Sequence, residues 1–230
     1  MRRYSLGKRE VIIRFVMLTA FLLCITFQLR TIMGEITCCA IEKDQDVKKI
    51  ALTFDDGPNP VYTDILLDGL QKRGAKASFF VLGEHVEAYP EMVERMYKEG
   101  HLIGNHTYSH MQLNQSNREQ YEQELIKTSE LIQKITGKEV NYVRPPYGSW
   151  DKTFEKELNM FPVLWNIDPV DWCSTDVNCI VQKVVKNSKE NAIILMHDNY
   201  ESSVNAALQV VDILQKQGYH FVTVDELLFD

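Results

Sequence analysis

Two neighbouring carboxylates close a short apolar segment. Ala51–Pro60 reads ALTFDDGPNP, so Asp55 and Asp56 follow an apolar run and precede a Gly-Pro pair. An apolar run bounded by glycine and proline is typical of a buried strand that ends in a tight turn. Aspartates also favour turns for backbone reasons, so the pair alone fits either a turn or a functional site. In parallel α/β proteins, functional groups gather where such strands end.

Two histidines four residues apart are the second candidate feature. Gly104–His110 reads GNHTYSH, and on a helical turn this spacing lets His106 and His110 face one ion. With one aspartate they form a His/His/Asp set, the three-ligand pattern that leaves catalytic zinc open to water. The remaining histidines outside candidate motifs are interpreted as ordinary surface or core residues: His85, His101 and His220.

Three further apolar runs end in unusual polar residues. NYVRPPYG delivers Arg144, LWNIDPVDW delivers Asp171 and AIILMHD delivers His197. Singly, each fits a structural role: a surface arginine, a turn aspartate and a capping histidine. Five such endings in one chain favour a shared site.

These segments together resemble the catalytic domain of the polysaccharide deacetylases, the NodB-homology or carbohydrate esterase family 4 group. The resemblance covers Lys48–Asp230 and keeps the order of the family's five motifs. The motifs are TFDDGP at Thr53–Pro58, HTYSH at His106–His110, RPPYG at Arg144–Gly148, DPVDW at Asp168–Trp172 and ILMH at Ile194–His197.

The resemblance implies a metal site and a general base. Asp56, His106 and His110 would hold one divalent metal; the nitrogen-rich set favours Zn²⁺, with Co²⁺ or another transition metal as the alternative. Asp55 would be the base, oriented by Arg144. This division of the Asp pair is carried over from the family, because residue type alone does not say which aspartate binds the metal.

The same resemblance assigns the rest of the reaction. The backbone N–H of Tyr147 would stabilise the oxyanion, and His197, held by Asp171, would protonate the leaving amine. Trp172 and Leu195 would line the pocket for the acetyl methyl group, although such residues are also common in simple core packing.

The elements that must position these residues alternate along the chain. Apolar runs predict strands at 49–54, 77–82, 101–105, 140–144, 161–167, 192–197 and 220–224. Amphipathic stretches predict helices at 61–73, 91–99, 118–135, 177–189 and 204–217. This alternation indicates parallel strands with right-handed crossovers. Seven strands suggest a barrel, and the resembled family has a distorted (β/α)7 barrel; an open doubly wound sheet is the alternative.

The N-terminus is different in kind. Residues 1–10 are basic, and 11–29 are apolar apart from Arg14 and a few weakly polar residues. We expect a transmembrane signal anchor at 11–29, with a cleaved signal peptide as the alternative, then a linker at 30–47 and the catalytic domain at 48–230. The domain would therefore face outward, as a single-pass membrane protein or a secreted one.

Charge argues against nucleic acid as a partner. Six of the 25 basic and one of the 32 acidic residues lie in the first 30, which leaves a net charge of −12 beyond them. Such a domain has no basic patch for a phosphate backbone. We expect a monomer whose partner is a neutral glycan.

The chain has five cysteines, and outside the cytosol cysteines can form disulfides. Cys173 and Cys179 lie six residues apart after the DPVDW motif, and we predict that they form a disulfide in air. Free thiols are the alternative. A four-cysteine zinc site is disfavoured because the chain has no CxxC pair.

The predicted activity is metal-dependent removal of acetyl groups from N-acetylated glycans. An outward-facing bacterial enzyme meets peptidoglycan first, so N-acetylglucosamine there is the preferred substrate and chitin oligomers the second choice. An O-acetyl xylan esterase is the alternative, since the same site can cleave either bond. A glycosidase is disfavoured because adjacent aspartates do not straddle a glycosidic bond. A non-catalytic glycan-binding module would be expected to have lost a ligand or the base.

Overall fold

In the residues that the structure describes, seven parallel strands form one sheet. The computed structural model describes residues 48–229, together with residues 17, 21, 23–26 and 28. Neighbouring strands follow the order β5-β4-β3-β2-β1-β6, and β7 also pairs with β1. The strands are β1 Lys48–Asp55, β2 Ser78–Val81, β3 Leu102–Asn105, β4 Tyr142–Val143, β5 Phe161–Pro162, β6 Ile193–His197 and β7 Tyr219–Val222.

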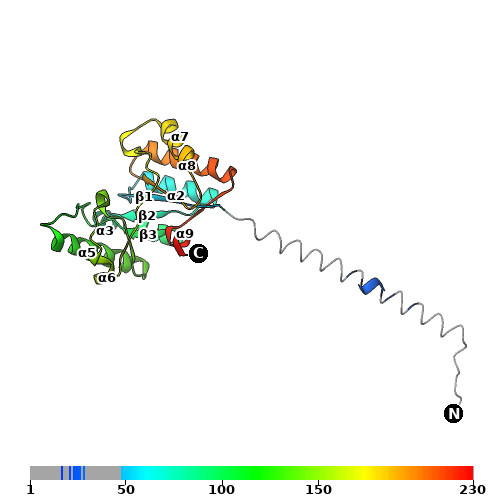
Figure 1. Ribbon diagram of the computed structural model, residues 1–230, viewed down its shortest axis with the longest axis horizontal. Coiled ribbons are helices and arrows are strands. Elements are labelled where there is room, and N and C mark those ends of the chain that lie inside the picture. The colour runs from blue at the N-terminus through cyan, green and yellow to red at the C-terminus, as the bar shows by residue number, and fades with distance from the viewer. Residues whose placement is uncertain (1–16, 18–20, 22, 27, 29–47, 230) are drawn as a thin grey trace, which may run out of the picture. The chain divides into compact units, whose positions relative to one another are not determined.

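Helices connect the strands and pack around the sheet. Helix α8 contacts α2 and α7, and helices α3, α4 and α5 contact one another. Figure 1 shows α7 and α8 on one side of the strands and α3, α5 and α6 on the other. The helices are α2 Tyr62–Arg73, α3 Gly83–Ala88, α4 Pro90–Lys98, α5 Arg118–Thr136, α6 Thr153–Glu157, α7 Val177–Asn187, α8 Glu201–Lys216 and α9 Val224–Phe229, with short 3₁₀ turns η1 Pro146–Gly148 and η2 Asp171–Cys173. The long predicted helices are confirmed, whereas α3, α6 and α9 are too short to produce a periodic pattern.

Strand β1 is central, and its side chains alternate between two buried layers. It pairs with β2 on one side and with β6 and β7 on the other. Ile50, Leu52 and Phe54 belong to the large cluster that the helices complete, whereas Ala51 belongs to a small cluster with residues of β2 and of the segment after β5. Because successive side chains of a strand point to opposite faces, Asp55 lies on the same face as Ala51.

The strands at one edge are shorter than predicted. The runs at 140–144 and 161–167 form strands of only two residues each, β4 and β5. Prolines limit both, since Pro145 follows Arg144 and Pro162 has no N–H for a ladder hydrogen bond. Farther along, Ile167 forms a single parallel bridge to Ile194. The strand order from β1 to β5 runs in one direction, which differs from the reversed order of a doubly wound sheet.

The N-terminal segment is a separate unit. Contacts divide the chain into Met1–Asp46 and Val47–Asp230. Most of the predicted signal anchor and all of the predicted linker at 30–47 lie outside the described residues, and the few described positions of the anchor are helical and exposed. Within the described part of the chain, no helix has the length and apolar character needed to span a membrane.

Candidate active site

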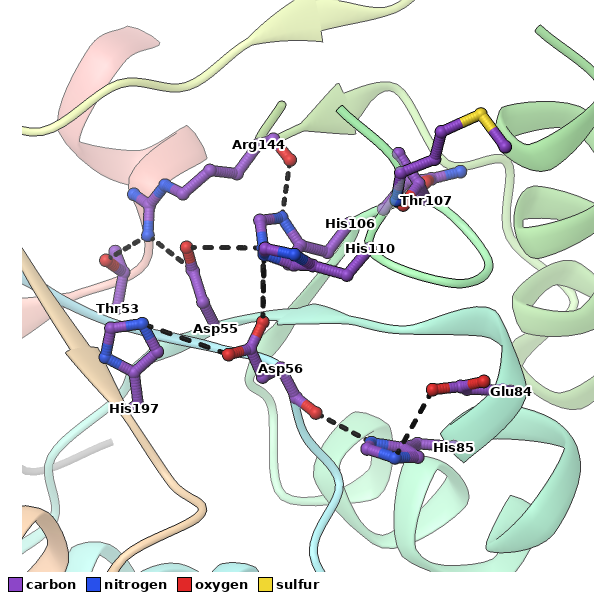
Figure 2. A network of polar contacts seen from close by, with 12 residues as sticks. Thr53, Asp55, Asp56, Glu84, His85, His106, Thr107, His110, Arg144 and His197 are labelled. Carbon is purple, nitrogen blue, oxygen red and sulfur yellow. Dashed lines mark hydrogen bonds and ion pairs between the residues drawn. The ribbon is translucent and has the colours of Figure 1, made fainter. Parts of the chain in front are cut away.

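The predicted site residues meet at one end of the sheet. Asp55 is the last residue of β1 and His197 the last of β6, while His106 and Arg144 directly follow β3 and β4. Parallel strands bring their carboxyl ends to the same edge, so residues far apart in the sequence converge there. Figure 2 shows their side chains pointing toward one another.

Asp56 and the two predicted histidines form a compact donor set. Oδ1 of Asp56 lies 3.3 Å from Nε2 of His106 and 3.6 Å from Nε2 of His110. The three ligand atoms all lie within 4.8 Å of one another, which is the spacing of a possible metal site. Ligands at tetrahedral zinc, at about 2.0–2.1 Å from the ion, are themselves roughly 3.3 Å apart. The geometry therefore fits a small divalent cation.

The electrostatics of the set also fit a cation. Oδ1 of Asp56 is buried and accepts no hydrogen bond from the described residues. Burial opposes ionisation of Asp56, but the neighbouring imidazoles, His106 first and then His197 and His110, outweigh it and lower the pKa of Asp56. Burial and the neighbouring His106 lower the pKa of His110, which favours the neutral imidazole that binds metals. Nδ1 of His106 donates to the Arg144 carbonyl (2.6 Å), so Nε2 is left free as a ligand.

The segment that carries the histidines is a loop, so the predicted helical turn is wrong. Residues 106–110 have no helical assignment, and Thr107 and His110 have positive φ angles of 65° and 59°. Side chains replace helical hydrogen bonds: Asn105 accepts from Thr107 N–H (2.8 Å), and Glu124 accepts from the next two N–H groups. The two imidazole rings still lie 5.0 Å apart.

A buried ion pair fixes Asp55. Nη1 of Arg144 donates to Oδ1 of Asp55 (2.7 Å) and to the Thr53 hydroxyl (2.6 Å), and its Nε donates to the Val163 carbonyl (3.0 Å). Arg144 is completely buried, and Asp55 is only 4% exposed. Burial lowers the pKa of the Arg144 guanidinium, and Asp55 acts against that shift. The other carboxylate oxygen, Oδ2, lies 3.8 Å from Nε2 of His106 and faces the donor set.

His197 and Asp171 form a second pair beside the donor set. Asp171 accepts from Nδ1 of His197 and from the His197 backbone N–H, both at 2.9 Å. Burial opposes protonation of His197, but the hydrogen bond and charge of Asp171, aided by Asp55 and Asp56, raise its pKa to about 9. Nε2 of His197 lies 4.0 Å from Asp56. The pair therefore presents a protonated imidazole to the donor set.

At least one member of each of these units lines a cavity of about 330 Å³. Tyr147 and Trp172 stand at its rim, 68% and 56% exposed, while Leu195 is buried at 5%. The Tyr147 ring lies edge-on to His110, with ring centroids 4.9 Å apart. The lining consists of Asp55, Asp56, His106, His110, Pro145, Tyr147, Trp165, Asp168, Trp172, Leu195, His197 and Tyr200.

Several residues of this region were not predicted from the sequence. Thr53 contacts Arg144, and strand alternation would have placed it on the same face as Asp55. Tyr200 lies in the loop after β6 and has no periodic signal. The ring of His85, interpreted as an ordinary histidine, lies 2.7 Å from the backbone carbonyl of Asp56.

The predicted disulfide between Cys173 and Cys179 is not formed in the structure. Both thiols are free. The Cys173 thiol donates to the Val170 carbonyl (3.4 Å), and Cys179 lies in the first turn of α7, where its backbone N–H is bound by the capping Asp176. The free-thiol alternative therefore describes this conformation.

Comparison with known proteins decides the family. Residues 42–163 match the family model described as polysaccharide deacetylase. The chain belongs to this family. The match covers the Asp-Asp, His/His and arginine motifs.

Three relatives of this chain are named as peptidoglycan or chitooligosaccharide deacetylases. It is 41% identical over 184 residues to the peptidoglycan-N-acetylmuramic acid deacetylase PdaC of Bacillus subtilis, across 80% of this chain and 39% of that protein. It is 43% identical over 195 residues to a peptidoglycan-N-acetylglucosamine deacetylase of Bacillus cereus, across 81% and 91%. A chitooligosaccharide deacetylase of Rhizobium leguminosarum is 35% identical, across 77% and 91%.

Solved structures agree on the fold. The structure of PdaC from Bacillus subtilis superposes with a TM-score of 0.76 at 41% identity, covering 79% of this chain and 90% of that one. A carbohydrate esterase family 4 pseudoenzyme from Bacillus anthracis superposes with a TM-score of 0.74 at 26% identity, covering 80% and 66%. Because a pseudoenzyme shares this fold, activity must be argued from the site itself.

Proposed function

We propose that the protein is a metal-dependent deacetylase of N-acetylated glycans. The observation that carries the proposal is the convergence of three units on one cavity: the Asp55–Arg144 pair, the Asp56/His106/His110 set and the His197–Asp171 pair. Each unit supplies one part of an amide hydrolysis, namely a base, a cation site and an acid.

The cation would be held by Asp56, His106 and His110. Zn²⁺ is our first choice because two of the three donors are imidazoles, and Co²⁺ or another transition metal suits the same donors. A bound divalent ion supplies Lewis acidity, which lowers the pKa of a coordinated water and polarises a carbonyl group.

Asp55 acts as the general base in this proposal. Its Oδ1 is occupied by Arg144 at 2.7 Å, so Oδ2, which faces the donor set, is the oxygen that accepts the proton of the attacking water. Arg144 is fixed in turn by Thr53 and by the Val163 carbonyl. A base held by a fixed arginine loses little entropy when it meets the water.

His197 acts as the general acid. With a pKa of about 9 it carries its proton on Nε2 at neutral pH, while Nδ1 is engaged by Asp171. Nε2 gives that proton to the nitrogen of the breaking C–N bond, because an amine leaves poorly as an anion. Asp55 and His197 end the neighbouring strands β1 and β6 at paired positions, so base and acid stand side by side at the cavity.

The remaining lining residues position the acetyl group. The backbone N–H of Tyr147 would donate to the developing oxyanion, as a preorganised donor at the cavity rim. Buried Leu195 and the exposed Trp172 would contact the acetyl methyl group and the sugar ring. Exposed Tyr200 offers a further aromatic face to the sugar.

The substrate we propose is N-acetylglucosamine in peptidoglycan, with chitin-like oligomers second. The names of the relatives support this class of glycan. The chain spans only 39% of the length of the Bacillus subtilis relative, so that protein's whole activity is not transferred.

The test is acetate release by the purified full chain. Peptidoglycan, chitin oligomers and acetylated xylan are supplied in parallel, each with and without added Zn²⁺. We expect release from peptidoglycan or chitin. Release from xylan alone would replace the proposal by an O-acetyl esterase, and no release from any substrate would reject catalysis.

We also propose the finer architecture of the chain. The single bridge between Ile167 and Ile194 supports a distorted (β/α)7 barrel that is nearly closed at this point. The basic residues before 11–29 support a signal anchor that leaves the catalytic domain outside the cytoplasm. Protease treatment of intact cells tests the orientation: cleavage of the domain is expected, and protection until lysis would contradict it.

A further inference from the structure

The backbone of Asp56 is held by a side chain outside the proposed catalytic groups. Nδ1 of His85, on α3, lies 2.7 Å from the Asp56 carbonyl oxygen. Because a carbonyl only accepts, Nδ1–H is the donor. Asp56 has a φ angle of 71°, in the left-handed region that few residues other than glycine adopt. Figure 2 shows the His85 ring facing this carbonyl from the side opposite the Asp56 carboxylate.

The segment that carries His85 also contacts the histidine loop. Its backbone N–H groups donate to carbonyls of the turn after β1 and of the histidine loop. His85 adds a side-chain hydrogen bond to the turn after β1. The backbone bonds are Leu82 N–H to Gly57 O (3.1 Å), Gly83 N–H to Thr107 O (2.9 Å) and Glu84 N–H to Tyr108 O (3.1 Å). The start of α3 is therefore the structural link between the aspartate and the two histidines.

We propose that His85 is a positioning residue for the metal site. The inference rests on the proposed role of Asp56 as a ligand. The Asp56 carbonyl and carboxylate branch from one Cα atom, so a bond that fixes the carbonyl restricts the left-handed backbone and with it the direction of Oδ1. The His85 side chain is 33% exposed, so it contributes little to the core, and this role is separable from folding.

Two substitutions of His85 introduce side chains of the same shape, so a difference between them reports the hydrogen bond and not the packing. In His85→Asn the amide nitrogen takes the place of Nδ1 and can donate, whereas in His85→Asp the same position holds an oxygen that only accepts at neutral pH. We expect His85→Asp to bind Zn²⁺ about three- to tenfold more weakly than the wild type, and His85→Asn to stay within about twofold. A new negative charge near a cation would tighten binding, so weaker binding cannot come from charge.

The measurement is competition for Zn²⁺ between the full chain and a chromophoric chelator. The visible absorption of the Co²⁺-loaded protein reports the ligand geometry, and thermal unfolding of the metal-free variants reports stability. Glu91→Gln is the control, because Glu91 is exposed in the first turn of α4 and its side chain has no hydrogen bond or ion pair with His85 or Asp56 among the described residues. We expect the control and the wild type to agree in both metal affinity and spectrum.

Several results would overturn the inference. Wild-type affinity in His85→Asp would do so, as would equal weakening in His85→Asn and His85→Asp. If His85→Asp does not fold, His85→Ala takes its place, with the same expected loss. A wild-type chain that binds no ion would reject the metal site as well, whereas normal wild-type binding with an unaffected variant would reject only the role of His85.

Discussion

Replacing Asp171 by asparagine should remove the proton from His197 without changing the shape of the site. Asp171 is 1% exposed and accepts both hydrogen bonds that orient the imidazole. An asparagine has only one acceptor oxygen. If that oxygen keeps the bond to the His197 backbone N–H, the amide NH₂ faces Nδ1, which must then accept and be unprotonated. The variant therefore favours a neutral imidazole.

The magnitude follows from the raised pKa. Burial opposes protonation of His197, but the hydrogen bond and charge of Asp171 raise its pKa from the ordinary 6.5 to about 9 in the metal-free fold. A difference of about 2.5 units corresponds to about 3 kcal/mol at 1.36 kcal/mol per unit. Because the folded pKa is the higher one, this stabilisation is complete below about pH 6.5 and is lost as the pH rises through about 9. In Asp171→Asn the pKa should fall to 6.5 or below, and the stabilisation should be absent.

Two measurements check this prediction on the metal-free protein. NMR titration of the histidine ring protons should show one histidine with a pKa near 9 in the wild type and none in Asp171→Asn. Urea unfolding between pH 6.5 and 9 should show that the wild type loses more stability than the variant. With metal restored, turnover at neutral pH should fall by about 10²–10⁴-fold, as expected for a lost general acid. A variant in which His197 still titrates near 9 would refute the assignment of its charge to Asp171.

Three further predictions concern the base, its partner and the cation. Asp55→Asn should bind metal almost normally but lose about 10²–10⁴-fold in turnover. Asp56→Asn should lose metal affinity and recover some activity at high metal concentration. Metal content and turnover distinguish the two variants, and equal metal loss in both would make both aspartates ligands. Arg144→Met should lower the free energy of unfolding by about 3–5 kcal/mol, because Asp55 would remain buried without its cation. The surface control Arg118→Met should change it far less, since solvent screens its ion pairs; similar urea midpoints for the two variants would contradict this. Chelation should abolish acetate release and Zn²⁺ or Co²⁺ should restore it, so full activity in verified metal-free protein would exclude a catalytic metal.

Much of the site was predictable because strand ends are visible in the sequence. An apolar run followed by polar residues locates the carboxyl end of a strand, and parallel strands bring those ends to one edge. Asp55, Arg144 and His197 were found in this way; in the structure Asp55 and His197 line one cavity, and Arg144 is buried and bonded to Asp55. The division of roles between Asp55 and Asp56 was carried over from the family. In the structure Asp55 pairs with Arg144 and Asp56 lies beside the two histidines, and which aspartate binds a metal stays a prediction.

The tertiary structure decided what depends on contacts between distant segments. The path of residues 106–110 is set by Glu124, on α5, and by the start of α3, so a local spacing rule predicted a helical turn that does not form. His85 contacts Asp56 only because α3 packs beside the end of β1, and Tyr200 reaches the cavity through a loop without periodicity. Sequence patterns record which face of a strand or helix is buried. They do not record which loop will lie against it, because that depends on the packing of the whole domain.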